Sequence, residues 1–374
     1  MDFNKRYFRS LDWVMILLIL CLAVFSFIGI SGATPNTNDE WKQLFFYGMG
    51  FAVLFGILLF DYNTISNFSY PLYGFGIVLL IGVLFTPAQM GAHSWYSFNG
   101  INFQPSELMK LFVIMSVAKY LSDKSERDES IETFKDLMPV LLLIGIPLLL
   151  ILVQPDLGTA MVFMGIMISM LVVSGLHKRF YVMLGSATVG LFGILTLLYF
   201  FANDFFFKIV RRHQWSRIES WWQPETHPDG YHLLQSLTAV GSGKLFGKGI
   251  GEGTQARYGW VPVGESDFVF TVIAEELGFI GSSILILIFF FMIYRMVRIA
   301  MNAKDMFGMY VVTGVIGMFV FQIFENIGMT IQLMPITGIT LPFVSYGGSS
   351  LVSNFLIMGM VLNIGMRHKK LTFE

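Results

Sequence analysis

The stretch LDWVMILLILCLAVFSFIGI occupies residues 11–30 and contains a single charged residue, Asp12. About 20 apolar residues are enough for a helix to cross the hydrocarbon core of a bilayer, so this block is predicted to be a membrane-spanning helix. Lys5, Arg6 and Arg9 precede it, as basic residues precede a secretory signal. Its apolar core is longer than the roughly 7–15 residues of a signal peptide, and further apolar blocks follow. We therefore expect a retained first helix.

Comparable apolar blocks recur along the whole chain. Of its 374 residues, 55% are hydrophobic and 13% are charged, about half the roughly 25% charged residues of a soluble domain. The fold class is therefore predicted as an all-α integral membrane protein, with residues 1–374 forming a single polytopic membrane domain. About ten spans are expected, near 11–30, 41–60, 69–86, 104–121, 137–153, 158–175, 180–202, 267–297, 306–333 and 345–366.

The basic residues of the short loops predict the orientation. Loops at 31–40, 87–103, 154–157 and 334–344 contain no Lys or Arg. Because cytoplasmic loops are enriched in Lys and Arg, we expect both termini in the cytoplasm and these loops outside. The segments then assigned to the cytoplasm contain Lys5, Arg6, Arg9, Lys124, Arg127, Lys135, Lys178, Arg179, Arg295, Arg298, Lys304, Arg367, Lys369 and Lys370.

A large extracytoplasmic loop, residues 203–266, is expected between spans seven and eight. It contains Trp215, Trp221 and Trp222, which could anchor it at the lipid interface. A glycine-rich run follows at 241–253. With Lys244, Lys248 and Arg257, this run suggests backbone that approaches an anion, although it lacks the spacing of a P-loop and a following Ser or Thr. Loops of this length usually have a function.

Composition also excludes several kinds of site. Cys21 is the only cysteine, which excludes an internal disulfide and a cysteine-built metal site. The net charge of −1 provides no general attraction for nucleic acid. No metal ligands can be identified from the pattern, and the short basic loops carry no nucleotide-binding signature, which argues against ATP as an energy source.

Two polar clusters open predicted spans near the outer face. Glu107 and Lys110 are three residues apart and share one helix face. They could be a structural, mutually neutralising pair, but ionisable groups at membrane depth are costly and usually functional. Asp156 follows Gln154-Pro at an outer turn, where it could simply cap the next helix.

A third cluster places four carboxylates within twelve residues. Asp267 begins the eighth span, Glu265 precedes it, and Glu275 and Glu276 follow two turns later. Capping explains one carboxylate near a helix start but not four. A carboxylate in a polar cavity near a lysine is suited to act as a general base.

The fourth cluster opens the last span with glycines and hydroxyls. Such a helix start can offer backbone N–H groups to a phosphate, while small residues also permit close helix packing; both readings stay open. The candidate binding residues here are Ser345, Tyr346, Gly347, Gly348 and Ser349. Glu325-Asn326 in span nine is interpreted as a buried pair that locks helices together.

Together the clusters predict a polar cavity that opens outward. It would suit a polyprenyl-phosphate-linked substrate, with the lipid among the helices and the headgroup in the cavity. The pattern of residues does not identify the sugar.

Five strings, in order along the chain, resemble the SEDS family (shape, elongation, division and sporulation) of bacterial membrane proteins. Two stretches, Asn326-Ile-Gly-Met329 and Asp229-Gly-Tyr231, look more like the elongation branch of the family than its division branch. The strings are Gln104-Pro-Ser-Glu107, Gln154-Pro-Asp156, Asp267-Phe-Val-Phe270 with Ala274-Glu-Glu-Leu-Gly278, Asn326-Ile-Gly-Met329 and Ser345-Tyr-Gly-Gly-Ser349.

The resemblance implies a peptidoglycan glycosyltransferase of the bacterial cytoplasmic membrane that polymerises lipid II. It implies that Asp267 is the catalytic carboxylate, which would deprotonate the acceptor hydroxyl in an inverting reaction. Lys110, loop lysines or arginines, or a divalent cation could stabilise the diphosphate leaving group; no tightly bound cofactor is expected. Glu107, Asp156 and residues 345–349 would shape the cavity. The expected partners are a class B penicillin-binding protein and membrane lipids.

The sequence departs from the family pattern at two positions, and two alternative functions remain open. Many members have an Arg before the Trp of the first outer loop, whereas His93 and Ser94 precede Trp95 here. If that Arg binds diphosphate, another cation must replace it in this chain; Trp95 itself is a candidate substrate-binding residue. Val263 also stands after Pro262 where many members have Glu, which leaves the role of Glu265 open.

The alternatives are a lipid II flippase, which should line a path to both leaflets, and a noncatalytic scaffold, in which Asp267 would be replaceable.

Overall fold

The computed structural model describes residues 10–35, 37–87, 93–98, 101–127 and 133–367. Each of the ten predicted spans coincides with a helix. These helices are α2(Trp13–Ala33), α3(Asp39–Leu58), α5(Ser69–Val83), α6(Pro105–Ser125), α7(Phe134–Val153), α8(Leu157–Val173), α9(Lys178–Phe201), α14(Val269–Met301), α15(Met306–Thr330) and α16(Gly348–Met366).

Seven of the described helices, namely α2, α3, α7, α9, α14, α15 and α16, are long and apolar enough to cross a membrane, while α5 and α8 are apolar but shorter. Helix α6 differs because Glu107, Lys110 and Lys119 fall within its first fifteen residues. It packs against α5, α7, α8, α15 and α16, and these neighbours shield it from lipid. The all-α membrane fold is confirmed; the number of spans remains a prediction.

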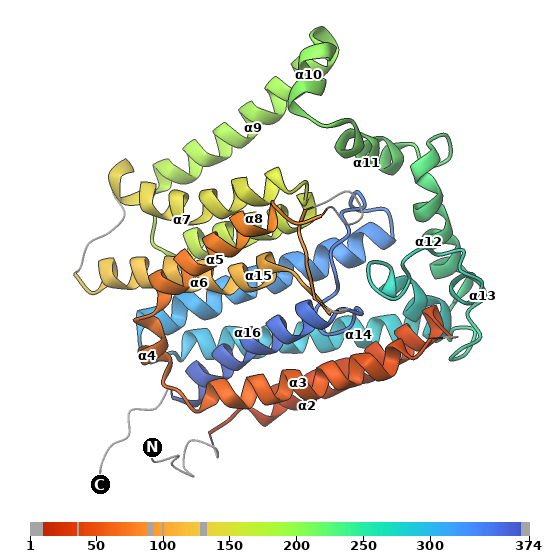
Figure 1. Ribbon diagram of the computed structural model, residues 1–374, viewed down its shortest axis with the longest axis horizontal. Helices are drawn as coiled ribbons and strands as arrows, with labels where there is room; N and C mark the ends of the chain where they lie inside the picture. Colours follow the sequence, from red (N-terminus) through yellow and green to blue (C-terminus); the bar gives the residue numbers. More distant parts are fainter. Residues whose placement is uncertain (1–9, 36, 88–92, 99–100, 128–132, 368–374) are drawn as a thin grey trace.

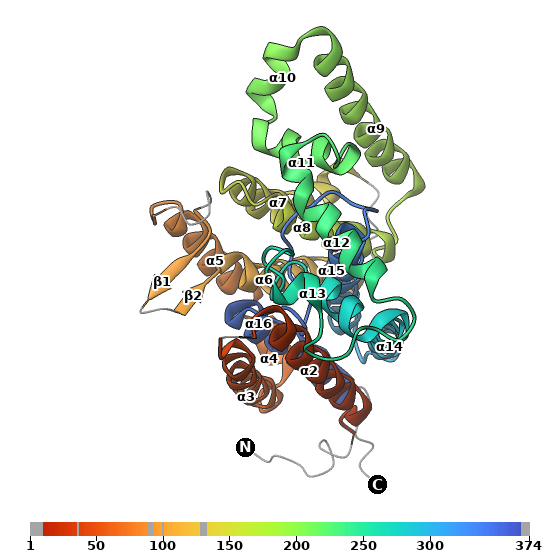
Figure 2. The same cartoon turned by 90° about the vertical axis from the view of Figure 1, so that its right-hand side faces the viewer.

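Helix α14 lies at the edge of the bundle and packs against α15 and α2 (Figure 2). Helices α6, α15 and α16 form the centre (Figures 1 and 2). Helices α2 and α3 flank it on one side, and α5, α7 and α8 on the other. Helix α9 lies apart: its apolar window has no buried residue, and it extends away from the bundle in both views. An apolar helix with so little protein contact is suited to a lipid environment.

The predicted outer loop, 203–266, is largely helical. It contains α10(Asn203–Ile209), α11(Arg212–Trp222), the 3-10 turn η1(Pro228–Gly230), α12(Tyr231–Ser242) and α13(Thr254–Arg257). These elements gather at one end of the bundle (Figure 1). A short antiparallel hairpin of β1(Tyr96–Phe98) and β2(Ile101–Phe103) precedes α6, with Tyr96 opposite Phe103. The short helix α4(Tyr62–Ser66) joins α3 to α5.

The glycine-rich run packs against a kink in α14. Gly278 has φ 67° and ψ −163°, which interrupts the helix. The interrupted backbone bonds to the glycine-rich run instead: Phe279 N–H donates to Lys244 O at 2.9 Å, and Lys248 N–H donates to Glu275 O at 3.0 Å. Gly247 has φ 81°, and a Cβ there would lie 2.0 Å from Glu276 O. The run therefore needs glycine to let two backbones meet.

We expect Gly247→Ala to lower the thermal unfolding temperature of the purified protein in detergent. A left-handed backbone costs a non-glycine residue about 1–2 kcal/mol, and the clash with Glu276 O adds to this. Gly251→Ala is the matched control, because Gly251 has a similar φ of 74° but open space around its Cβ position. Equal losses in the two variants would contradict the close packing described for Gly247.

Candidate active site

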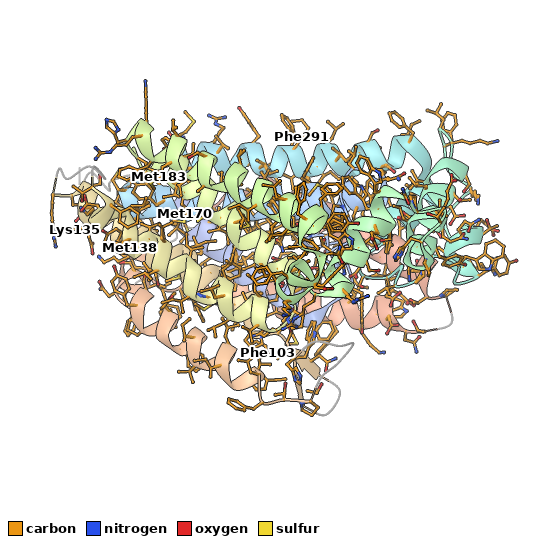
Figure 3. All side chains as sticks on the ribbon, turned by 90° about the horizontal axis from the view of Figure 1, so that it is seen from above. Phe103, Lys135, Met138, Met170, Met183 and Phe291 are labelled. Atoms are coloured by element: carbon orange, nitrogen blue, oxygen red, sulfur yellow. The ribbon has the colours of Figure 1, made fainter. Side chains whose placement is uncertain are left out.

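A cavity of about 660 Å³ lies where α6, α8 and α16 begin. Phe103, labelled in Figure 3, borders it on the side of the hairpin. The cavity brings together residues from all four polar clusters. Of the predicted site residues, those that line it are Trp95, Glu107, Lys110, Asp156, Asp267, Tyr346, Gly347, Gly348 and Ser349.

Glu107 and Lys110 form a buried ion pair on the cavity wall. Pro105 opens α6, and the spacing of three residues brings Lys110 Nζ within 2.8 Å of Glu107 Oε2. The two side chains are 7% and 1% exposed. Among the described residues, Lys110 Nζ has no other partner. Because an ammonium has three donors, Lys110 can bind an anion in the cavity while it stays paired with Glu107.

Asp156 caps α8 and also forms part of the cavity wall. Its carboxylate accepts from Thr159 N at 3.0 Å and from Thr159 Oγ1 at 2.8 Å, so the capping interpretation is confirmed. Gln104 Nε2 donates to the same carboxylate at 3.0 Å, and Gln104 N donates to Ser349 Oγ at 3.1 Å. Burial raises the pKa of Asp156. Gln104 thus ties together the beginnings of α6, α8 and α16.

Asp267 lies in the turn before α14. Ser266 Oγ donates to its Oδ1 at 3.0 Å, while its Oδ2 has no hydrogen bond within the described part of the chain. Asn326 Nδ2 holds the backbone in place by donating to Asp267 O at 2.9 Å and to Ile339 O at 2.7 Å. Burial raises the pKa of Asp267. A carboxylate with a raised pKa and a free oxygen is suited to accept a proton from a bound hydroxyl.

The glycines at the start of α16 are compatible with both predicted roles, close helix packing and anion binding. A Cβ at Gly348 would lie 2.7 Å from the ring of Phe46, so close packing requires a small residue. Gly347 N donates to Gln43 Oε1 at 3.3 Å. The helix also begins on the cavity wall, where its first N–H groups can attract an anion.

Ser345 does not line the cavity but lies behind its wall. Its hydroxyl accepts from Leu341 N at 2.8 Å and donates to the carbonyl of Ser266. Tyr346 N donates to Glu265 O at 2.8 Å. These bonds fasten the start of α16 to the turn that carries Asp267. Ser345 therefore supports the cavity wall from behind.

Lys244 and Lys248 are also outside the set of cavity-lining residues. Lys248 Nζ lies 2.6 Å from Glu275 Oε1, and the Lys244 side chain is exposed. The glycine-rich run and the residues directly after it do approach anions, but these anions are carboxylates of the protein itself. Gln255 N and Ala256 N donate to Glu275 at 2.9 and 3.1 Å, and Gly251 N donates to Glu276 Oε1 at 3.0 Å.

Arg217 is a cavity residue that we did not single out from the sequence. It comes from α11, lines the cavity, and donates from Nη1 to Thr337 O at 3.0 Å. With Lys110 it places two cations in the cavity that Asp267 also lines. The signal in the sequence was its place among the basic residues of 203–266, since the short outer loops contain none. Its contact with Thr337, 120 positions away, required the fold.

The described residues of the cavity do not form a ready-made metal site. In the described ranges, no three His, Cys, Asp or Glu side chains lie close enough together to hold a metal ion. A divalent cation here would therefore rely on substrate oxygens for part of its coordination, as Mg²⁺ often does with phosphates.

Known proteins share this architecture. A family model described as "Cell cycle protein", covering FtsW, RodA and SpoVE, matches residues 9–370. Stage V sporulation protein E of Bacillus subtilis is 35% identical over 369 residues, which cover 95% of this chain and 97% of that protein. Peptidoglycan glycosyltransferase MrdB of Escherichia coli is 33% identical over 376 residues, covering 99% and 98%.

Solved structures agree with this likeness. RodA of Thermus thermophilus superimposes with a TM-score of 0.71 at 27% identity, covering 96% of this chain and 98% of that one. A chain from a peptidoglycan synthase complex, studied for its coordination of polymerization and crosslinking, gives a TM-score of 0.82 at 27% identity with the same coverage. The chain therefore belongs to the FtsW/RodA/SpoVE family, which is the SEDS family that its motifs resemble.

Proposed function

We propose that this protein is a peptidoglycan glycosyltransferase that polymerises lipid II for cell elongation and shape. The observation that carries the proposal is the cavity in which Asp267 lies with Lys110 and Arg217. Family membership supports it, as does the name of the relative MrdB, a peptidoglycan glycosyltransferase. The stretch Asn326-Ile-Gly-Met329, more like the elongation branch, supports the role in shape.

The proposed reaction is a direct displacement. Asp267 Oδ2 accepts the proton of the acceptor's 4-hydroxyl as the oxygen attacks C1 of the donor sugar. The new bond joins C1 to that oxygen, and the bond from C1 to the diphosphate breaks, with inversion at C1. Lys110, Arg217 and the first N–H groups of α16 stabilise the charge on the leaving diphosphate. A raised pKa makes Asp267 a better base near neutral pH.

The cavity is proposed to face the outside of the cell. Segment 203–266 lies at the cavity end of the bundle, and Lys135 lies at the opposite end (Figure 3). Lys124, Lys178, Arg298 and Arg367 are also at that opposite end, at the ends of α6, α9, α14 and α16. Since basic residues favour the cytoplasmic side, that end is assigned to the cytoplasm. Lys5, Arg6, Arg9, Lys369, Lys370 and both chain ends fall outside the described residues.

The proposed partner is a class B penicillin-binding protein that crosslinks the new strands. The likeness to a chain of a peptidoglycan synthase complex supports this pairing. The alternative of a flippase has less support, because the cavity residues come from one end of the helices, whereas a flippase needs a path to both leaflets.

Replacing Asp267 by Asn should lower the rate of polymerisation by about two to four orders of magnitude. Loss of a general base typically lowers a rate by about 10²–10⁴-fold, and Asn keeps the size of the side chain. The measurement is glycan strand formation from purified lipid II, with the partner present and its transpeptidase site inactivated. Glu225→Gln, an exposed site beyond α11, is the control. A well-folded Asp267→Asn protein that polymerises at the wild-type rate would remove Asp267 from the mechanism.

The pH dependence of the polymerisation rate should change when Glu265 or Arg217, two charged neighbours of Asp267, is replaced. Burial raises its pKa, Glu265 raises it further, and Arg217 lowers it. The rate should fall as the pH drops through this raised pKa, because the protonated carboxyl cannot accept a proton. Arg217→Gln should therefore move this acid limb to higher pH, and Glu265→Gln should move it to lower pH.

This experiment compares pH–rate profiles of the two variants and the wild type. The position of the limb is read separately from the maximal rate, because Arg217→Gln also weakens diphosphate binding. Acid limbs at the same pH in all three proteins would show that another group controls the ionisation.

A further inference from the structure

A second cavity lies at the other end of the bundle. It has a volume of about 270 Å³, and α2, α14 and α16 meet around it. About 30 residues of α14 separate it from Asp267, or roughly 45 Å at the helical rise per residue. The cavity is therefore independent of the glycosyl transfer site. Its lining residues are Ser10, Leu11, Asp12, Arg295, Arg298, Ile299, Asn302 and Gly365.

The charged groups of this cavity leave one cation uncompensated. Both oxygens of Asp12 are occupied: Oδ1 accepts from Met15 N at 3.1 Å, and Oδ2 lies 2.8 Å from Arg295 Nε and 2.7 Å from Arg295 Nη2. Arg295 is thereby held in place. The side chain of Arg298 has no hydrogen bond or ion pair within the described part of the chain. Two arginines thus face one carboxylate.

The arrangement suits a phosphate group. Arg295 and Arg298 are three residues apart and therefore lie on one face of α14. A guanidinium presents a planar fork of donors that matches phosphate oxygens. Arg295 is held in place by Asp12, so a phosphate that binds here meets one donor that is already ordered. The phosphate also neutralises the charge of Arg298, which has no other partner among the described residues.

Apolar surface next to the cavity points to a lipid as the source of that phosphate. Phe291 is one turn before Arg295 on α14, is 50% exposed, and projects outward from the bundle (Figure 3). Leu287, one turn before Phe291 on the same helix, is 52% exposed. A headgroup in the cavity could therefore continue into acyl chains along these side chains.

We propose that this cavity binds the headgroup phosphate of an anionic phospholipid in the cytoplasmic leaflet. Basic pockets between helices on this side of a membrane are suited to such headgroups. The choice of leaflet rests on the sidedness proposed above, whereas the binding itself does not depend on glycosyl transfer. The site ties α2 and α14 to the surrounding lipid, far from the active site.

The test measures the thermal unfolding temperature of the purified full chain in a neutral detergent. Dioleoylphosphatidylglycerol should raise this temperature more than dioleoylphosphatidylcholine, because a ligand of the native state stabilises it. In Arg298→Ala, the apparent affinity for phosphatidylglycerol should fall about tenfold, as expected for one lost charge-assisted hydrogen bond. Arg179→Ala is the matched control, since Arg179 is an exposed arginine near the same end, beside Phe180.

Three outcomes would overturn the proposal. Equal affinity for phosphatidylglycerol in the wild type and Arg298→Ala would place the lipid elsewhere. Equal stabilisation by phosphatidylcholine would show that the charge is not recognised. Equal stabilisation by inorganic phosphate would assign the cavity to a soluble anion. Failure of glycan polymerisation would leave this result unchanged, so the two proposals can fail separately.

Discussion

The ion pair between Glu107 and Lys110 constrains the whole bundle. Two charges within one turn of a helix cannot face lipid without a large free-energy cost. Helix α6 therefore has to be central, and five helices surround it. The same two charges sit where α6 begins, and neighbouring helices also begin or end there with polar groups. The ion pair and the polar ends of the neighbouring helices thus meet at the cavity.

The helices around this cavity are held in register by polar bonds between their ends. Gln104 links α6 to the beginnings of α8 and α16, and Asn326 fixes the backbone of Asp267 to α15. The segment from α10 to α13 supplies Arg217 from a part of the chain outside the bundle core. Such a network brings the carboxylate, Lys110 and Arg217 into one cavity before substrate binds. Charged groups that are positioned in advance are what electrostatic stabilisation of a leaving diphosphate requires.

Much of this could be predicted from the sequence, because local rules govern it. Apolar length gave the positions of the long helices, and a spacing of three residues gave the Glu107–Lys110 pair. Arg217 was missed because its position depends on a contact with Thr337 across 120 residues. Lys248 was assigned to substrate because the sequence cannot show which anion a lysine will meet; in the fold it meets Glu275. The helices within 203–266 were missed because their pattern is short and mixed.

The most direct test of the account is a structure of the folded Asp267→Asn protein with bound lipid II, determined by cryo-electron microscopy with its partner. The donor diphosphate should lie against Lys110, Arg217 and the start of α16. An acceptor hydroxyl should lie within hydrogen-bond distance of residue 267. A diphosphate bound instead at Lys244 and Lys248, or at the opposite end of the bundle, would contradict this mechanism.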